Sequence, residues 1–255
     1  EKAYDTTWKH GILIDLHQMG LRGRLTTFIS NFLSNRQFRV RVGSTLSNVY
    51  PQEMGVPQGS ILSVTLFIVK INSITQILPQ SNSFQYSLFV DDFTISCRGR
   101  STNLVQRQLQ RCLNNVQEWA DNNGFRFSPT KTVCVHFCNQ RKLHLDPALT
   151  LNGSFIPVVD KAKFLGLVFD KKLNFKEHIN VTRKKCVNPT NLLKVLSHLD
   201  WGADRKILLQ LFRSLIRSKI EYGSIIYGAA RPSYLKKLET VHNAGIRLCL
   251  GAYRT

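Results

Sequence analysis

The sequence lacks several features that would assign it to a common class of protein. It has no apolar run of about 18 residues, the length that begins to suffice for crossing a bilayer, and no lipid-anchor motif. Its seven histidines form no HExxH or triad-like arrangement, and there is no GxxxxGK phosphate loop. These absences argue against a membrane protein, a hydrolase and a P-loop nucleotide triphosphatase.

Acidic side chains are also scarce. The 255 residues include 35 Lys and Arg against 16 Asp and Glu, which gives a net charge of +19. Residues 171–255 carry 17 basic and 5 acidic side chains, whereas residues 1–170 carry 18 and 11. An excess of this size favours a polyanionic partner over a basic face that meets only solvent.

The six cysteines do not form the dense framework of a small secreted protein, which predicts reduced thiols inside a cell. Cys134, His136 and Cys138 alternate as on one face of a strand, and a zinc site there is the alternative to core packing. No second ligand pair at zinc-finger spacing follows, so core packing is favoured. The chain begins at Glu1 without a methionine or signal pattern, which we interpret as a cut from a longer polypeptide.

Hydrophobic periodicity predicts a mixture of helices and short strands. The expected helices cover 7–19, 21–34, an apolar stretch from 61 to 78, 102–120 and most of the chain after about 172. The expected strands are a hairpin over 37–50, a tight hairpin of 86–90 with 93–97, and short runs near 133–138, 149–151, 154–158 and 163–169. Residues 205–219 combine an apolar stripe with a basic face, as in a bundle helix.

The sharpest local feature is the pair Asp91-Asp92, which we place at the turn of the tight hairpin. Adjacent carboxylates repel each other unless a cation lies near them. Mg²⁺ prefers hard oxygen ligands, and a two-metal site of this kind supports phosphoryl transfer. Taken alone, however, two aspartates at a turn are more often solvated turn residues.

Further motifs accompany this pair in a fixed order. They are Glu1–Asp5 followed by Trp8, Val56–Ser60 followed by a buried helix, Gly124-Phe125 with Ser128–Thr132, Phe164–Gly166, and a tail from Tyr222-Gly223 to Gly251–Thr255. In order and spacing they resemble the motifs of reverse transcriptases, and the tail is similar to the jockey branch of non-LTR (LINE-type) retrotransposons. The resemblance covers nearly the whole chain, and the ordered set is far more specific than any single motif.

The resemblance implies an α+β fold. Residues 1–170 would form a right-hand polymerase palm, an antiparallel sheet with helices on one face, and 171–255 an all-helical, basic thumb with a C-terminal connection. The fingers would be largely missing. The implied reaction adds deoxynucleotides to a primer 3′-hydroxyl on an RNA template, with two Mg²⁺ ions or Mn²⁺ in their place. The implied partners are an RNA template, a DNA primer and dNTPs, with no membrane, in a nucleoprotein of the nucleus or cytoplasm.

The resemblance also implies metal ligands. Asp91 would be the direct bridging ligand, and Asp92 the weaker or second-sphere partner. The family's first motif carries a metal-binding aspartate five residues before an aromatic that screens the sugar. If Tyr4 is that aromatic, the aspartate falls before Glu1, so the chain would hold only part of the metal site. Asp5 is then a lesser candidate ligand.

Other residues receive roles by the same resemblance. Tyr4 would exclude ribonucleotides, Gln58 and Gly59 would brace the nucleotide, and Lys131 would neutralise or protonate the pyrophosphate. The primer grip would consist of Phe164, Leu165 and Gly166. The phosphate backbone would be followed by Lys184, Lys185, Arg213 and Arg217 in a salt-dependent way.

Plainer interpretations remain open. Without the family, Lys131 is a solvated charge, Gln58-Gly59 a turn before a helix, and Tyr4 a core residue. For the whole chain, the alternatives to an enzyme are a catalytically inactive nucleic-acid-binding remnant of such an element and a degenerate copy that only folds.

Overall fold

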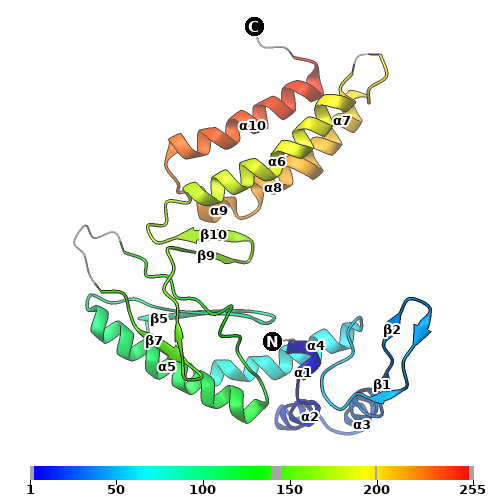
Figure 1. Ribbon diagram of the computed structural model, residues 1–255, viewed down its shortest axis with the longest axis vertical. Coiled ribbons are helices and arrows are strands. Elements are labelled where there is room, and N and C mark those ends of the chain that lie inside the picture. The colour runs from blue at the N-terminus through cyan, green and yellow to red at the C-terminus, as the bar shows by residue number, and fades with distance from the viewer. Residues whose placement is uncertain (1–2, 139–144, 199, 253–255) are drawn as a thin grey trace. The chain divides into compact units, whose positions relative to one another are not determined.

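The computed structural model describes residues 3–138, 145–198 and 200–252, which belong to two compact units (Figure 1). The first unit comprises Glu1–Cys134 with His144–Val158, and the second comprises Val135–Leu143 with Val159–Thr255. Glu1 and Lys2 of the first motif and Tyr253–Thr255 of the tail lie outside the described residues. The predicted boundary between palm and thumb at residue 170 stays a prediction, since compactness alone does not define those parts.

The described part of the first unit holds the one-turn helix α1, four longer α-helices, one 3-10 helix and paired short strands. Its elements are α1 Ala3–Thr6, α2 Lys9–Gln18, α3 Arg24–Leu33, β1 Gln37–Phe38, β2 Arg41–Val42, β3 Thr45–Leu46, β4 Tyr50–Pro51, α4 Ile61–Asn72, η1 Ser73–Ile77, β5 Phe84–Phe89, β6 Asp92–Cys97, α5 Thr102–Asn123, β7 Leu149–Leu151 and β8 Ser154–Ile156. Helices α2 and α3, of ten residues each, lie beside each other. The structure is therefore a mixture of helices and small antiparallel strand pairs.

Helix α4 lies between two hydrophobic clusters of this unit. Phe67 and Ile71 pack in a cluster with α5 and the β5–β6 hairpin, whereas Leu66 packs in a second cluster with α2 and α3. The apolar stretch is therefore buried on two sides, as its composition predicts. Helix α5 ends where Gly124 adopts a left-handed conformation with φ +71°, which is a common way to terminate a helix.

Among the described residues, every sheet is a two-stranded antiparallel pair. The single antiparallel sheet expected of a palm is not formed by these residues; their strands form separate two-stranded ribbons. The region 133–138, predicted as a strand, makes only an isolated bridge from Cys134 to Val158. Cys134, His136 and Cys138 thus do not share a strand face.

The second unit begins with a β-hairpin and continues as a helical bundle. Its elements are β9 Lys161–Phe164, β10 Leu167–Asp170, α6 Lys176–Leu196, α7 Arg205–Phe212, the π-helical η2 Arg213–Arg217, α8 Ser218–Glu221, α9 Ser224–Tyr227 and α10 Pro232–Leu250. Helices α6, α7 and α10 run side by side around Cys186, Phe212 and Cys249 (Figure 1). The run predicted near 163–169 as one strand is a hairpin that turns at Leu165-Gly166.

Helix α6 contains Pro189, which has no N–H to donate to the carbonyl of Lys185. The Lys219 ammonium donates to that carbonyl oxygen instead, at 3.3 Å. A proline in the helix interior is tolerated here because another helix of the bundle supplies the missing donor.

In the part of the chain that the structure describes, none of the helices combines the length and apolarity that a bilayer crossing needs.

Candidate active site and nucleic-acid surface

The carboxylate pair lies at the tip of the β5–β6 hairpin, but the turn is shifted by one residue from the prediction. Phe89 pairs with Asp92, so the two turn residues are Val90 and Asp91, and Asp92 is the first residue of β6. Val90 has φ +56°, a left-handed conformation that a β-branched side chain rarely adopts. Such strain costs about 1–3 kcal/mol and is most often found at functional sites.

Packing on the hydrophobic core orients this tip. Val90 and Phe93, which flank the carboxylates, pack against the core cluster around Phe67. Asp91 and Asp92 are both exposed, and the Phe89 side chain is 59% exposed. The tip therefore presents two carboxylates to solvent while the neighbouring apolar residues hold it in place.

Tyr4 packs against the same core cluster as Val90. Its ring stacks on Phe67, with ring centroids 4.5 Å apart and an interplanar angle of 20°. Phe67 is fully buried, so it gives the Tyr4 ring a rigid platform. The first motif and the carboxylate tip, far apart in sequence, are thereby held on one core.

Backbone contacts join the first motif to the Val56–Ser60 loop. The N–H of Val56 donates to the Tyr4 carbonyl, and the N–H of Gly55 to the Thr7 carbonyl, each at 2.8 Å. A Cβ on Gly55 would lie 2.6 Å from the carbonyl oxygens of Tyr4 and Asp5, and its φ is +82°. Only glycine fits this close approach.

The Asp5 carboxylate is engaged by this loop. Gln58 Nε2 donates to Asp5 Oδ1 at 2.6 Å, and Arg36 donates to the Gly55 carbonyl at 2.8 Å. Burial lowers the pKa of the Arg36 guanidinium, and the nearby Asp5 carboxylate partly offsets that effect. Asp5 is therefore hydrogen-bonded to Gln58, and its charge acts on the Arg36 guanidinium. Gly59, the other predicted nucleotide brace, is exposed with φ +93° and open space around its Cα.

Lys131 follows a compact turn that is attached to the carboxylate hairpin. The backbone N–H groups of Lys131 and Thr132 donate to the Ser128 carbonyl at 3.3 and 3.0 Å, and Lys131 is exposed. Phe127, just before the turn, contacts Phe93 with ring centroids 6.4 Å apart. Aromatic packing thus connects the segment that bears Lys131 to the strand that begins with Asp92.

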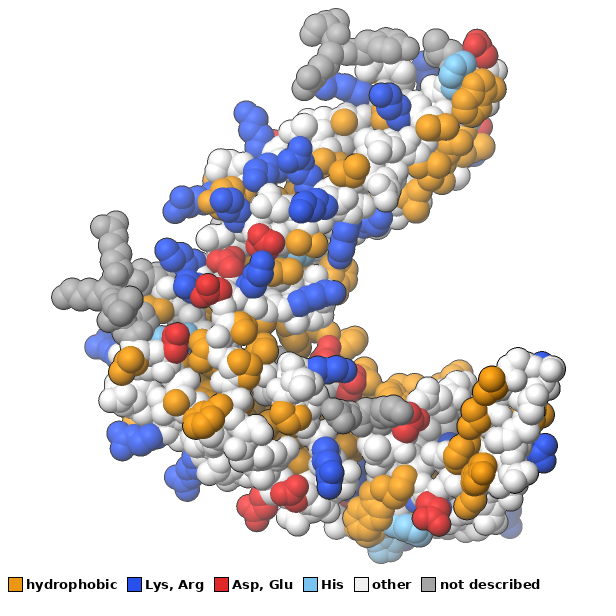
Figure 2. Space-filling view, viewed as in Figure 1, with side chains coloured by type: hydrophobic (Ala, Val, Ile, Leu, Met, Phe, Trp, Pro, Cys, Tyr) orange, Lys and Arg blue, Asp and Glu red, His pale blue; other side chains and the backbone are white. Residues whose placement is uncertain are grey.

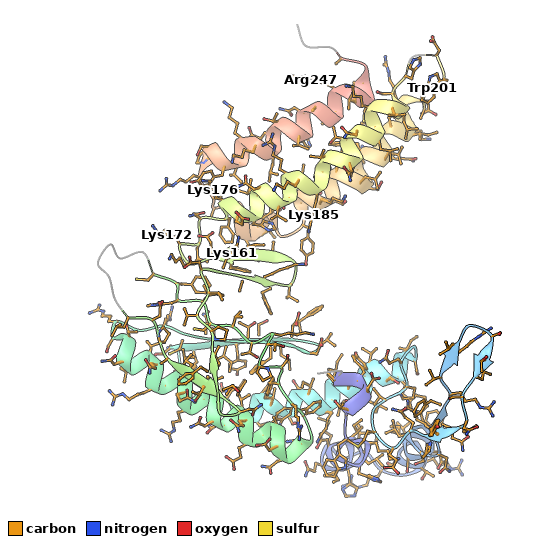
Figure 3. The ribbon with its side chains drawn as sticks, viewed as in Figure 1. Lys161, Lys172, Lys176, Lys185, Trp201 and Arg247 are labelled. Atoms are coloured by element: carbon orange, nitrogen blue, oxygen red, sulfur yellow. The ribbon has the colours of Figure 1, made fainter. Side chains whose placement is uncertain are left out.

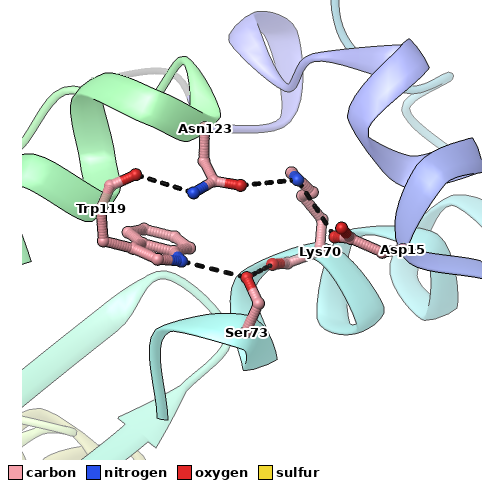
Figure 4. A network of polar contacts seen from close by, with 5 residues as sticks. All are labelled: Asp15, Lys70, Ser73, Trp119 and Asn123. Carbon is pink, nitrogen blue, oxygen red and sulfur yellow. Dashed lines mark hydrogen bonds and ion pairs between the residues drawn. The ribbon is translucent and has the colours of Figure 1, made fainter. Parts of the chain in front are cut away.

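A buried polar network joins the helices beneath these motifs (Figure 4). Lys70 of α4 is 1% exposed; its Nζ lies 3.0 Å from Asp15 Oδ2 of α2 and 2.7 Å from Asn123 Oδ1 of α5. Asn123 Nδ2 donates to the Trp119 carbonyl at 2.8 Å, and Trp119 Nε1 donates to Ser73 Oγ at 3.1 Å. The network fixes the relative positions of three helices from which the motif segments extend.

The carboxylate oxygens at the hairpin tip suit a hard divalent cation, because such oxygens are the preferred ligands of Mg²⁺. Within the described ranges, no group of three or more His, Cys, Asp and Glu residues is placed to hold a metal ion. The described residues thus place two exposed carboxylates at the tip, without a third such ligand beside them.

In the second unit, the predicted primer grip is the turn of the β9–β10 hairpin. Phe164 pairs with Leu167, and Leu165 and Gly166 form the turn, with φ +44° and +82°. Positive φ at both central positions is the requirement of a type I′ turn, in which Asn-Gly is preferred. Leu165 is therefore, like Val90 and Leu173, an aliphatic residue with a left-handed backbone conformation.

The predicted phosphate-contacting residues of the second unit are all exposed. Lys184 and Lys185 lie on α6, and Arg213 and Arg217 bound the π-helical turn. Arg217 Nε donates to Glu221 at 2.6 Å, so its charge is partly compensated.

Lys185 shares its unit with other basic residues that the sequence motifs did not single out, namely Lys161, Lys172, Lys176 and Arg247 (Figure 3). Figure 2 shows lysine and arginine side chains spread over the visible face of α6, α10 and the β9–β10 hairpin.

The structure brings together part of the predicted site. Tyr4 and Val90 share one core cluster, and Asp5 is bonded to Gln58. Sequence patterns missed Phe67 and Arg36. Phe67 has the signal of an ordinary core residue, and Arg36 is 19 residues from its partner Gly55, so no local pattern indicates either role.

Comparisons with known proteins agree with this set of motifs. A family model described as reverse transcriptase (RNA-dependent DNA polymerase) matches residues 1–169. The chain is 27% identical over 260 residues to the RNA-directed DNA polymerase from mobile element jockey of Drosophila melanogaster, covering 99% of this chain and 28% of that protein. It is 26% identical to the probable RNA-directed DNA polymerase from transposon X-element of the same species, covering 98% of this chain and 27% of that protein. The jockey polymerase of Drosophila funebris is 26% identical, over 99% of this chain and 28% of that protein. The chain thus spans little more than a quarter of the length of these relatives.

Proposed function

This chain belongs to the reverse transcriptase family, and from that premise we propose that it is the palm and thumb of an RNA-directed DNA polymerase from a jockey-like, non-LTR mobile element. It adds dNTPs to a primer 3′-hydroxyl on an RNA template. The observation that carries the proposal is the common core of Tyr4 and Val90, which holds the first motif and the carboxylate tip on one support.

The carboxylates of Asp91 and Asp92 would hold Mg²⁺, or Mn²⁺ in its place, with Asp91 as the direct ligand and Asp92 as the weaker partner. When bound, such ions activate the attacking hydroxyl and neutralise the charge of the triphosphate. The exposed, hard-oxygen tip fits this role. In the family's pattern a further aspartate, expected just before Glu1, completes the ligand set.

The remaining residues position the nucleotide. Tyr4, fixed on Phe67, places its ring where a ribose 2′-hydroxyl would collide with it. Gln58 orients the loop through Asp5, and Gly59 leaves room for the nucleotide beside it. The exposed Lys131 ammonium neutralises or protonates the departing pyrophosphate.

The second unit holds the nucleic acid. The Leu165-Gly166 turn supports the primer 3′ end as the primer grip, and exposed basic residues of the helical thumb contact the phosphate backbone in a salt-dependent way. The protein acts inside the cell, in the nucleus or cytoplasm, as part of a nucleoprotein with its template RNA.

The test is primer extension on an RNA template with residues 1–255 in their full-length polypeptide. We expect dNTP- and Mg²⁺-dependent extension that Asp91→Ala abolishes and that Asp121→Ala, an exposed carboxylate on α5, leaves intact. Equal extension by wild type and Asp91→Ala would refute the site. Salt-sensitive RNA binding without extension would identify an inactive nucleic-acid-binding remnant instead.

A further inference from the structure

A tyrosine at the end of α8 contacts the turn of the β9–β10 hairpin. The Tyr222 hydroxyl donates to the carbonyl oxygen of Leu165 at 2.6 Å. Leu165 is the turn residue with φ +44°, a conformation that a leucine seldom adopts. The hydrogen bond therefore holds the turn residue whose backbone conformation is the least favourable for its side chain.

Two glycines allow this close contact. A Cβ on Gly166 would lie 3.1 Å from Tyr222 Cε1, and one on Gly223 would lie 2.6 Å from Leu167 Cδ2. Gly166 thus leaves space for the Tyr222 ring beside the turn. Gly223, the residue after Tyr222, leaves space for Leu167 of strand β10. The sequence pair Tyr222-Gly223 is explained by this two-way fit.

Strand β10 is also attached to the helices. Leu167 packs in a cluster with Phe175, Ile179 and Tyr227, and the Val168 N–H donates to His178 Nδ1 at 3.3 Å. The strand is thus anchored by buried contacts, whereas the Tyr222 hydroxyl gives the turn a hydrogen bond to the helical part of the unit. Tyr222 itself is 58% exposed, so this contact is not part of a closed core.

We propose that Tyr222 is a positioning residue for the primer terminus. Its hydroxyl holds the Leu165-Gly166 turn in its left-handed conformation and ties that turn to the helical part of the same unit. The inference rests on the primer-grip role proposed for Phe164–Gly166. A movement of the helices is then transmitted to the primer 3′ end through Tyr222.

Tyr222→Phe removes the hydroxyl and keeps the ring. Without the hydrogen bond, the turn opens more often, and we expect amide hydrogen exchange within residues 161–170 to accelerate about fivefold. Affinity for an RNA–DNA duplex with a recessed primer 3′ end is expected to fall by up to about fivefold, the limit reached when the open turn predominates in the variant. Affinity for single-stranded RNA of equal length is expected to stay unchanged. Both measurements use the full-length protein and need no catalysis.

Two variants control the experiment. Tyr234→Phe removes a hydroxyl from α10 of the same unit and should alter neither measurement. Adding Leu165→Asn to Tyr222→Phe creates the Asn-Gly sequence that type I′ turns prefer, and it should restore slow amide exchange. Only exchange is measured in this variant, because Leu165 itself belongs to the proposed primer grip.

The outcomes separate this inference from the proposed function. Unchanged exchange in Tyr222→Phe, or faster exchange with full affinity for the recessed end, overturns the role of Tyr222 alone. A wild-type protein that binds recessed ends no better than single strands and extends no primer overturns the primer-grip function, and the inference with it. Faster exchange with selective loss of recessed-end affinity supports both.

Discussion

At the scale of single residues, the sugar-screening role proposed for Tyr4 would depend on what lies behind its ring. Its ring stacks on Phe67, which is fully buried. An aromatic pair of this kind contributes about 0.5–1.5 kcal/mol beyond the burial of its area. A screening ring without such a platform would move away from an incoming 2′-hydroxyl.

Phe67→Leu keeps an apolar side chain at the site and removes the stacking partner. We expect kcat/KM for ribonucleotides relative to deoxynucleotides to rise about 2- to 10-fold, the change equivalent to the lost stacking energy. Single-nucleotide incorporation measures this ratio. Phe84→Leu, on the same core cluster, is the control, and an unchanged ratio in Phe67→Leu would contradict a platform role.

Lys70, in contrast to Tyr4, is expected to contribute to the stability of the fold and not to the site. Its ammonium is buried between Asp15 and Asn123. Lys70→Met leaves the Asp15 carboxylate without its partner, and we expect a loss of about 3–5 kcal/mol in the free energy of unfolding. Urea denaturation measures it.

The double variant Lys70→Met with Asp15→Leu tests the cause. It replaces both charges by apolar groups, so most of the lost stability should return. A double variant as unstable as Lys70→Met would show that the ammonium acts through its other contacts, the Asn123 amide and the Trp8 ring.

At the scale of elements, the junction of the β9–β10 hairpin with α6 contains a titratable group. His178 is buried; its Nδ1 accepts from the Val168 N–H, its Nε2 lies 3.4 Å from Thr182 Oγ1, and its ring lies beside Tyr227. Burial, and to a lesser extent the positive charge of Lys185, lower the pKa of His178. The folded protein therefore favours the neutral ring.

The sign of the pH dependence follows from this. Below a pH of about 6.5 the unfolded chain binds a proton at this histidine and the folded chain does not, until the lowered folded pKa is reached. The contribution of His178 to stability is thus complete above a pH of about 6.5 and falls as the pH decreases from there towards the lowered folded pKa. We expect the urea midpoint to drop between pH 7.5 and 5.5, with a smaller drop in His178→Gln. Equal drops in both proteins would assign the effect to other groups.

Elements were predictable to different degrees. The helices near 7–19, 21–34 and 102–120 are present as α2, α3 and α5, because a long amphipathic pattern needs only one buried face. The turn of the carboxylate hairpin was placed one residue late, because propensity favours aspartates over Val90 in a turn. Core packing of Val90 and Phe93 decided the register instead.

At the scale of the whole molecule, we expect the net charge of +19 to make the proposed nucleic-acid binding depend on salt. Each neutralised phosphate of a single strand contributes a slope of about −0.7 to the dependence of log affinity on log salt. If Lys184 and Lys185 each contact a phosphate, replacing both by glutamine should flatten the slope for single-stranded RNA by about 1.4. Fluorescence anisotropy over a salt series measures it.

The matched control for that prediction removes two positive charges from the first unit instead of from α6. Arg22→Gln with Arg24→Gln takes two exposed basic residues from the first unit and should leave the slope unchanged. If both double variants flatten the slope equally, binding depends on net charge and not on a surface of α6.

The sequence by itself determined the family, the order of the motifs, the main helices and the basic character of the second unit, because these depend on residue type and spacing along the chain. The tertiary structure decided which distant residues meet: Tyr4 with Phe67, Gln58 with Asp5, Lys70 with Asp15 and Asn123, and Tyr222 with Leu165. Each of these contacts joins positions that only packing of the core brings together. No local pattern records them, since a side chain's partner is set by the shape of the whole fold and not by its neighbours in sequence.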